Sequence, residues 1–178
     1  DDATNLLNLE HFNKYARAAA LWTAARLNQD ERNYLANLPL FRQHTDAFYV
    51  HAEPHNPGSW GYVHSHSDVR AALEAVSTQL CFIGHTHQPF IYVHNGFKIA
   101  PITASGPVEI KAGQRYLVNI GSIGQPRDGD ARSCFLIWDQ GLGTIELVRV
   151  EYDIPAAQKK IIEAGLPPFL AQRLELGH

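Results

Sequence analysis

The sequence has 178 residues, of which 45% are hydrophobic and 19% charged, and a formal net charge of −3. A chain of this length and composition forms an ordinary globular domain with a buried core. The weak negative charge and the lack of a basic run argue against general nucleic-acid binding, whereas small phosphorylated substrates stay open if a metal supplies positive charge. No apolar stretch approaches the roughly 20 residues that span a bilayer, and the acidic start at Asp1 is unlike a signal peptide. We therefore expect a cytoplasmic protein without membrane attachment.

The first part of the chain predicts two helices and a buried strand. Residues 11–26 contain no Gly or Pro and carry large apolar side chains at helical spacing. A second, short helix is predicted from Asn28 to Leu38, because Asn28 with Glu31 three residues later is typical of a capping box. The apolar run at residues 47–50 predicts a buried strand that ends just before His51.

The rest of the chain is predicted to be mostly β. A loop rich in Pro and Gly at residues 53–61 precedes a helix at 67–77 with Ser67 as its cap. Asn95-Gly96 is a hairpin signal, and two short helices are expected in the tail up to Leu176. The expected strands are 80–83, 90–94, 97–101, 107–110, 115–119, 133–138 and 144–151. Cys81 and Cys134 lie in apolar runs, which favours buried thiols over a disulfide.

Histidines follow two of the predicted buried strands. Gly84-His85-Thr86-His87 comes directly after one strand, and His51 comes directly after another. Extended residues i and i+2 point the same way and lie about 6.6 Å apart, so two imidazoles can each reach inward about 2 Å to a metal. Gly84 is expected to let the chain turn sharply before the pair. An ordinary surface turn explains the same pattern, and the residues alone do not choose between the two.

Longer segments around these histidines resemble a known family. Residues 80–89 are similar to the last signature motif of the calcineurin-like metallophosphoesterases, and residues 50–52 to the family's preceding His motif. Residues 119–130 resemble a segment of its small bacterial phosphodiesterase branch, as does the tail from Tyr152 to Pro167. The resemblance implies a four-layer α/β/β/α sandwich, with residues 1–178 as the C-terminal part of a single metallophosphoesterase domain.

The resemblance also implies an activity and a set of metal ligands. The expected enzyme is a metal-dependent phosphoesterase that hydrolyses phosphodiesters or small phosphorylated nucleotides through two divalent ions, with Mn, Zn and Fe all suited to such ligands. His51 and His85 would bind one ion and His87 the other.

The family's earlier motifs, which supply carboxylates and the catalytic histidine, do not appear in the sequence. Asp1 fits the last residue of the third motif, so the general-acid histidine is expected upstream of Asp1. Two divalent ions carry four positive charges, which neutral imidazoles do not balance, so the chain alone is expected to be inactive and to hold at most one weakly bound ion. We expect the missing N-terminal segment, or another copy of the chain, as a partner.

Four further residues have an ordinary reading beside the functional one. His55 is a candidate phosphate contact or an exposed loop residue, and His64 and His66 are candidate accessory contacts or part of an exposed loop. Arg127 either reaches a phosphate bidentately or pairs with a neighbouring aspartate, Asp128 or Asp130. The alternative to an enzyme is a non-catalytic protein-interaction scaffold of the same fold that has lost part of the metal site.

Overall fold

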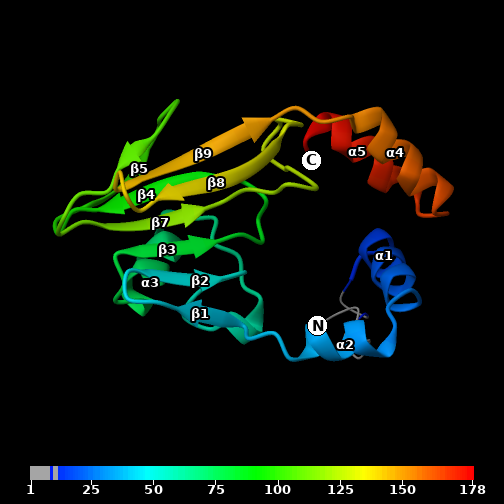
Figure 1. The fold of residues 1–178 in the computed structure, drawn as a ribbon, viewed down its shortest axis with the longest axis horizontal. Helices are drawn as coiled ribbons and strands as arrows, with labels where there is room; N and C mark the ends of the chain where they lie inside the picture. The colour runs from blue at the N-terminus through cyan, green and yellow to red at the C-terminus, as the bar shows by residue number, and fades with distance from the viewer. Residues whose placement is uncertain (1–8, 10–11) are drawn as a thin grey trace. The chain divides into compact units, whose positions relative to one another are not determined.

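The computed structural model describes residue 9 and residues 12–178. The chain divides into two compact units (Figure 1). One unit joins residues up to Pro39 with Asp153–Leu176, and the other consists of Leu40–Tyr152 with Gly177–His178. Asp1 and the acidic start of the chain lie outside the described residues.

The first unit is helical. Its elements are α1 (Lys14–Ala24), α2 (Gln29–Ala36), α4 (Ile154–Glu163) and α5 (Pro168–Leu176). The indole N–H of Trp22 donates to the Ala164 carbonyl at 2.9 Å, and Tyr15 stacks on Phe169 with ring centroids 4.5 Å apart. Helices from the two ends of the chain are thus packed together. The predicted capping box of α2 is present, since the Asn28 side chain accepts from the Glu31 backbone N–H.

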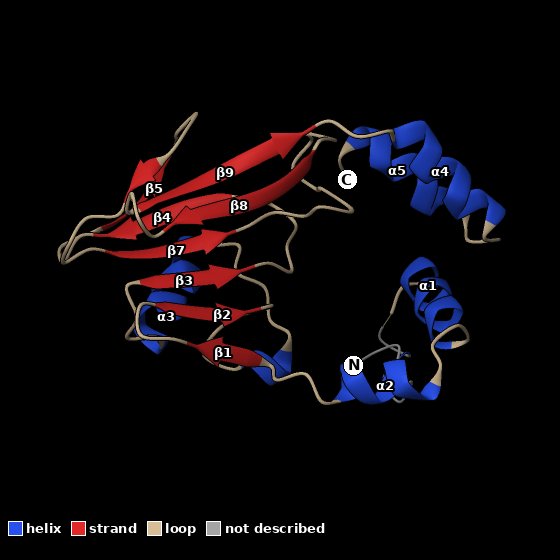
Figure 2. Ribbon diagram, viewed as in Figure 1, coloured by secondary structure: helices blue, strands red, loops and turns tan. Residues whose placement is uncertain are grey.

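The second unit contains two sheets, the helix α3 and a 3₁₀ turn (Figure 2). The larger sheet has the strand order β1-β2-β3-β7-β4-β5, and the smaller sheet has the order β6-β9-β8. The larger sheet consists of β1 (Phe41–Gln43), β2 (Ala47–Val50), β3 (Leu80–Ile83), β7 (Arg115–Asn119), β4 (Phe90–His94) and β5 (Ile99–Ile102). The remaining elements are β6 (Val108–Glu109), β8 (Ser133–Asp139), β9 (Thr144–Val150), α3 (His66–Ala75) and the 3₁₀ turn η2 (Pro57–Ser59). Strands β2, β3 and β7 are parallel neighbours.

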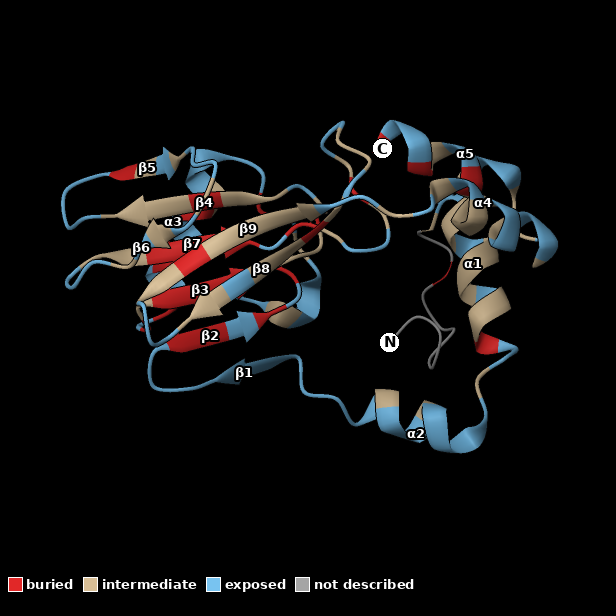
Figure 3. Ribbon diagram, turned by 45° about the horizontal axis from the view of Figure 1, so that its top comes forward, coloured by how far each residue is buried: buried red, intermediate tan, exposed pale blue. Residues whose placement is uncertain are grey.

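Side-chain alternation places one core on each face of the larger sheet. Phe48 pairs with Cys81, and Cys81 pairs with Leu117; all three lie in the core beneath α3. The intervening residues, including Leu80 and Tyr116, pack on the other face against residues of the smaller sheet. This unit is therefore layered α/β/β, and its strands β3 and β7 are buried along most of their length (Figure 3).

The mixed α/β architecture predicted from the sequence is confirmed, and several details differ. Helix α3 is capped by Ser65 and not by Ser67, because Ser65 and Asp68 form a reciprocal capping box. Strand β1 was not predicted, since its three exposed residues carry no buried pattern. Both α1 and α2 are shorter than expected.

The structure also bears on the predictions about the cysteines and about membrane-spanning segments. The two cysteines are buried free thiols, as predicted. Among the described residues, no helix is both long enough and apolar enough to cross a membrane.

Candidate metal centre

The candidate site lies where three adjacent parallel strands end. His51 follows β2, Gly84 and His85 follow β3, and Asn119 is the last residue of β7. The Gly84 N–H donates to the His51 carbonyl at 2.9 Å, so the strand ends stay joined beyond the sheet itself. The carboxyl ends of parallel strands are where α/β proteins collect ligand-binding groups. Sheet order, not sequence proximity, therefore brings these residues to one edge.

His51 and His85 meet at this edge. Their ring centroids are 5.1 Å apart and the rings are nearly perpendicular. The expected geometry of the His-Thr-His segment is wrong, because His85 and His87 have φ values of 63° and 59° and are not extended. Gly84, in contrast, does not adopt positive φ. The sharp turn is thus made by the histidines themselves, in the left-handed region that residues other than glycine adopt uncommonly.

Burial favours the neutral form of both imidazoles. Desolvation lowers the pKa of His51 below its ordinary value. Desolvation also lowers the pKa of His85, and the nearby His51, His87 and Arg127 lower it further, against a hydrogen bond to the Trp60 carbonyl that raises it. Neutral imidazole is the form that ligates metals. Both histidines are therefore suited to metal binding near neutral pH.

Backbone carbonyls orient two of the histidine rings. His87 Nδ1 lies 2.7 Å from the Gln125 carbonyl, and the His85 ring bonds the Trp60 carbonyl. A carbonyl accepts only, so each ring donates an N–H and carries its lone pair on the other nitrogen. Metal-ligating histidines are typically held in this way.

The histidines are ligands of a type that suits a divalent transition metal, but they are too few to complete its coordination shell. Imidazole nitrogens suit Mn, Zn and Fe. In the part of the chain that the structure describes, no three His, Cys, Asp or Glu side chains are grouped to hold a metal ion. His51, His85 and His87 would thus supply part of a coordination shell that wants about four ligands per metal.

Asn119 fastens the histidine loop to the sheet. Its buried amide donates to the Gly84 carbonyl at 2.7 Å and to the Thr86 hydroxyl at 2.8 Å. Its carbonyl oxygen accepts from the Gly121 N–H at 3.0 Å. Asn119 thus lies beneath the loop and bonds the residues on both sides of His85.

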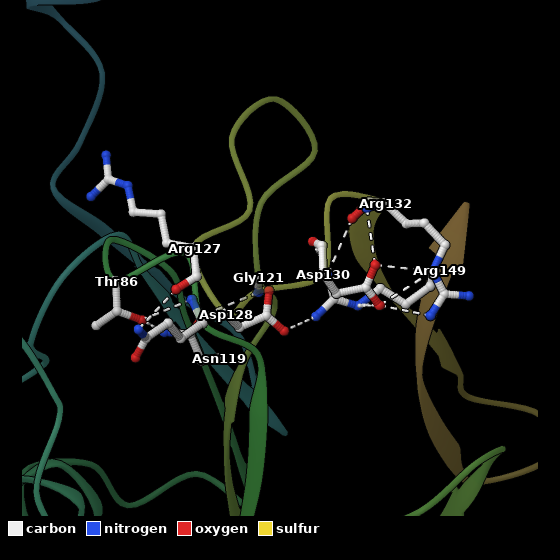
Figure 4. A network of polar contacts seen from close by, with 9 residues as sticks. Thr86, Asn119, Gly121, Arg127, Asp128, Asp130, Arg132 and Arg149 are labelled. Carbon is white, nitrogen blue, oxygen red and sulfur yellow. Dashed lines mark hydrogen bonds and ion pairs between the residues drawn. The ribbon is translucent and has the colours of Figure 1, made fainter. Parts of the chain in front are cut away.

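Arg127 lies close to the histidines. Its backbone N–H donates to the His87 carbonyl at 3.1 Å, and its guanidinium donates to the Gln125 side chain at 2.9 Å. Its side chain points away from Asp128 and Asp130, which interact with other arginines (Figure 4). The predicted alternative, in which Arg127 pairs with a neighbouring aspartate, is therefore not observed, and the guanidinium bonds the Gln125 side chain instead.

Asp128 and Asp130 instead clamp the chain that follows Arg127. Arg149 on β9 pairs with Asp128 and approaches Asp130 at 3.8 Å, while Arg132 pairs with Asp130 at 2.6 Å (Figure 4). Hydrogen bonds from Arg132 are the main cause that lowers the pKa of Asp130 to about 2. These contacts hold residues 128–132 in place.

The other predicted histidines do not join His51 and His85. His55 is exposed and its Nδ1 lies 2.9 Å from Glu53 Oε2. His66 contacts the Ile99 carbonyl at 3.2 Å, whereas His64 stacks on Tyr62 with ring centroids 5.2 Å apart. The rings of His64 and His66 therefore lie in different surroundings, despite their i, i+2 spacing.

Two aromatic residues at the site were not predicted. Trp60 lies 5.6 Å from His51 and 6.0 Å from His85, measured between ring centroids. Tyr62 stacks on His85 at 4.2 Å. Both follow the loop after His51, and the only sequence signal was an aromatic pair around Gly61 in a segment otherwise rich in small residues.

Comparison with known proteins places the chain in a family. Residues 13–140 match the Calcineurin-like phosphoesterase superfamily domain. The chain belongs to the calcineurin-like phosphoesterase superfamily. An uncharacterized protein of Methanocaldococcus jannaschii is 35% identical over 176 residues, which are 96% of this chain and 69% of that protein.

Similarity to solved structures supports the same fold. A metallophosphoesterase from Sphaerobacter thermophilus is 33% identical, with a TM-score of 0.85 over 99% of this chain and 73% of that one. A hypothetical protein from Pyrococcus horikoshii, 20% identical, has a TM-score of 0.72 over 94% of this chain and 62% of that one, and it supports the fold alone. The calcineurin-like phosphoesterases generally use divalent metals, and membership implies hydrolase activity on phosphoesters.

Proposed function

We propose that this calcineurin-like protein hydrolyses phosphodiesters or small phosphorylated nucleotides through a binuclear centre to which His51, His85 and His87 contribute. The observation that carries the proposal is the meeting of His51 and His85 at the carboxyl ends of β2 and β3, with ring centroids 5.1 Å apart. His87 and Arg127 lie near enough to lower the pKa of His85. A positive guanidinium and neutral imidazoles at one edge are the groups that an anionic phosphoester requires.

The chain's own residues have distinct tasks in this reaction. His51 and His85 present neutral nitrogens, and the carbonyls of Trp60 and Gln125 keep the rings of His85 and His87 in one orientation. Arg127 supplies a fixed positive charge to the phosphate oxygens, as guanidinium groups do for planar oxyanions. Divalent metals, when bound, would polarise the phosphoryl oxygens and activate a water molecule. No described residue is assigned as the general acid.

Replacing His85 with alanine tests this proposal. In the full-length protein, H85A should lower the turnover of a chromogenic phosphodiester by more than the roughly 10–100-fold that is typical for residues that only support a ligand. It should also weaken Mn²⁺ binding measured by calorimetry. His94→Ala is the matched control. His94 lies beside Arg115 in the register of β4 and β7, at the end of β7 opposite to Asn119, so its replacement should leave both measurements unchanged. Unchanged turnover in H85A would remove His85 from the site.

The scaffold alternative rests on one observation, the lack of a three-residue metal group among the described residues. A scaffold predicts no saturable Mn²⁺ binding and no hydrolysis by the unmodified full-length protein. An enzyme predicts saturable Mn²⁺ binding and hydrolysis, and it predicts that binding and hydrolysis both depend on His85. The same calorimetric titration therefore separates the two functions before any variant is made.

A further inference from the structure

An exposed aromatic surface adjoins the histidines. Trp60 is 38% exposed and Tyr62 is 51% exposed, although both rings contact the imidazole of His85. The ring of Tyr62 stacks on His85, with centroids 4.2 Å apart, and on His64, with centroids 5.2 Å apart. Part of the Trp60 residue is therefore accessible to solvent beside the site. Large apolar side chains exposed at a site offer a contact surface for a ligand.

Local contacts hold Trp60 in this position. Its carbonyl accepts a hydrogen bond from the His85 ring, and its backbone adopts the left-handed conformation with φ 57°. A bulky residue rarely adopts that conformation, which is enriched at ligand clamps. These features hold the backbone of Trp60, and its indole contacts the rings of His51 and His85.

Glu53 closes the loop that carries Trp60. Its backbone N–H donates to the Gly61 carbonyl at 3.2 Å, and its carboxylate contacts the Ser59 hydroxyl and His55. The Glu53 carboxylate also lies close over Gly61, since a Cβ added there would lie 2.5 Å from Glu53 Oε1. A loop closed in this way presents its aromatic residue without an ordering cost when a ligand binds.

We propose that Trp60, supported by the loop closed by Glu53, is a stacking surface for a flat aromatic group of the substrate. The substrate class is then a phosphoester that carries a nucleobase or a comparable aryl group, not a purely aliphatic one. Aromatic side chains stack on nucleobases without strong preference among them, because every base has a π face. This inference rests on the proposed phosphoesterase function and narrows its substrates.

The test compares ligands that differ only in the base. In the full-length protein with Mn²⁺, calorimetry should show adenosine 5′-monophosphate and uridine 5′-monophosphate binding roughly 5- to 100-fold more tightly than ribose 5-phosphate. Both nucleotides should also quench tryptophan fluorescence. Trp60→Leu should remove the difference in affinity and leave ribose 5-phosphate binding unchanged, whereas Trp60→Phe should keep most of the difference.

Phe97→Leu is the matched control, because Phe97 is 97% exposed in the β4–β5 turn; it should change no affinity. Equal binding of the nucleotides and ribose 5-phosphate by the unmodified protein would overturn the stacking surface while leaving phosphate recognition intact. A preference for nucleotides that persists in W60L would overturn it too. Binding of none of the three ligands would contradict the proposed function as well, so the two failures are distinguishable.

Discussion

Asn119 shows how one buried polar residue organises the candidate site. It has no exposed surface, and its side chain bonds the carbonyl of Gly84, the hydroxyl of Thr86 and the N–H of Gly121. Buried polar groups are stable only when they are paired. These bonds join β7 to the loop that carries His85, where the backbone has unfavourable φ values. Asn119 therefore holds a strained histidine loop without itself being placed among the metal ligands.

Replacing Asn119 with alanine should weaken both the fold and metal binding. The change leaves the Gly84 carbonyl and the Gly121 N–H without their partner, which should cost about 2–4 kcal/mol of unfolding free energy. Loss of support for His85 should weaken Mn²⁺ binding by roughly 10–100-fold. Urea unfolding and calorimetry measure the two effects.

The control for this change is Asn95→Ala. Asn95 also accepts backbone N–H groups, but it lies in the exposed β4–β5 turn. The control should cost no more than about 1 kcal/mol of unfolding free energy and should leave Mn²⁺ affinity unchanged. Equal Mn²⁺ affinity in N119A and the unmodified protein would show that Asn119 supports the fold alone.

At the scale of elements, strand β9 fixes the segment after Arg127 through charge pairs. Arg149 on β9 contacts Asp128, and its guanidinium also donates to the Arg132 carbonyl at 3.1 Å. Asp130 in turn accepts from Arg132. The segment itself has little apolar burial, so these pairs hold it in place. The strength of the pairs depends on ionised carboxylates and thus on pH.

Acid should weaken this clamp in a defined range. Hydrogen bonding to Arg132 lowers the pKa of Asp130 from 3.8 to about 2. Because the pKa is lower in the folded state, the stabilisation is present above the unfolded value and is lost as pH falls from about 4 to about 2. Solvent around this partly exposed pair reduces the effect. Asp130→Asn should therefore destabilise the protein more at pH 5 than at pH 2.5.

Urea unfolding at the two pH values measures this difference. Asp46→Asn, in the turn before β2, serves as the control and should not alter the pH dependence. If D130N lowers stability equally at both pH values, the stabilisation does not come from the ionised Asp130 carboxylate.

At the scale of the whole molecule, the described residues supply histidines to the candidate site but few carboxylates. Glu53, the acidic side chain in the loop after His51, is already engaged by Ser59 and His55. Three imidazoles, which bind metals in their neutral form, do not balance the charge of two divalent ions, and they are too few to complete two coordination shells. The described residues therefore suit one weakly held ion better than two.

We expect the 178-residue chain by itself to bind no more than one Mn²⁺ or Zn²⁺ ion, and to bind it weakly. Metal analysis after gel filtration measures the ions that remain, and calorimetry measures the affinity. His85→Ala should remove the remaining binding, whereas His94→Ala should not. Two tightly bound ions per chain would contradict this expectation and would require carboxylate ligands other than Glu53.

Local patterns in the sequence were enough to predict most elements of the fold. Strands β2, β3 and β7 have the predicted bounds, because short apolar runs between turn residues identify buried strands. The capping box at Asn28 and the hairpin at Asn95 depend only on neighbouring residues, and both form. The position of His51 and His85 just after buried strands could likewise be predicted, because the end of a strand depends on neighbouring residues in the sequence.

The tertiary structure decided how those residues meet. The order β2-β3-β7 joins His51 to His85 across more than thirty positions of the chain, and no local pattern encodes strand order. The left-handed backbone at His85, the bonds of Asn119 beneath it and the indole of Trp60 beside it all arise from packing at that edge. The sequence by itself thus determined which side chains end the strands, whereas non-local packing determined their conformation and their neighbours.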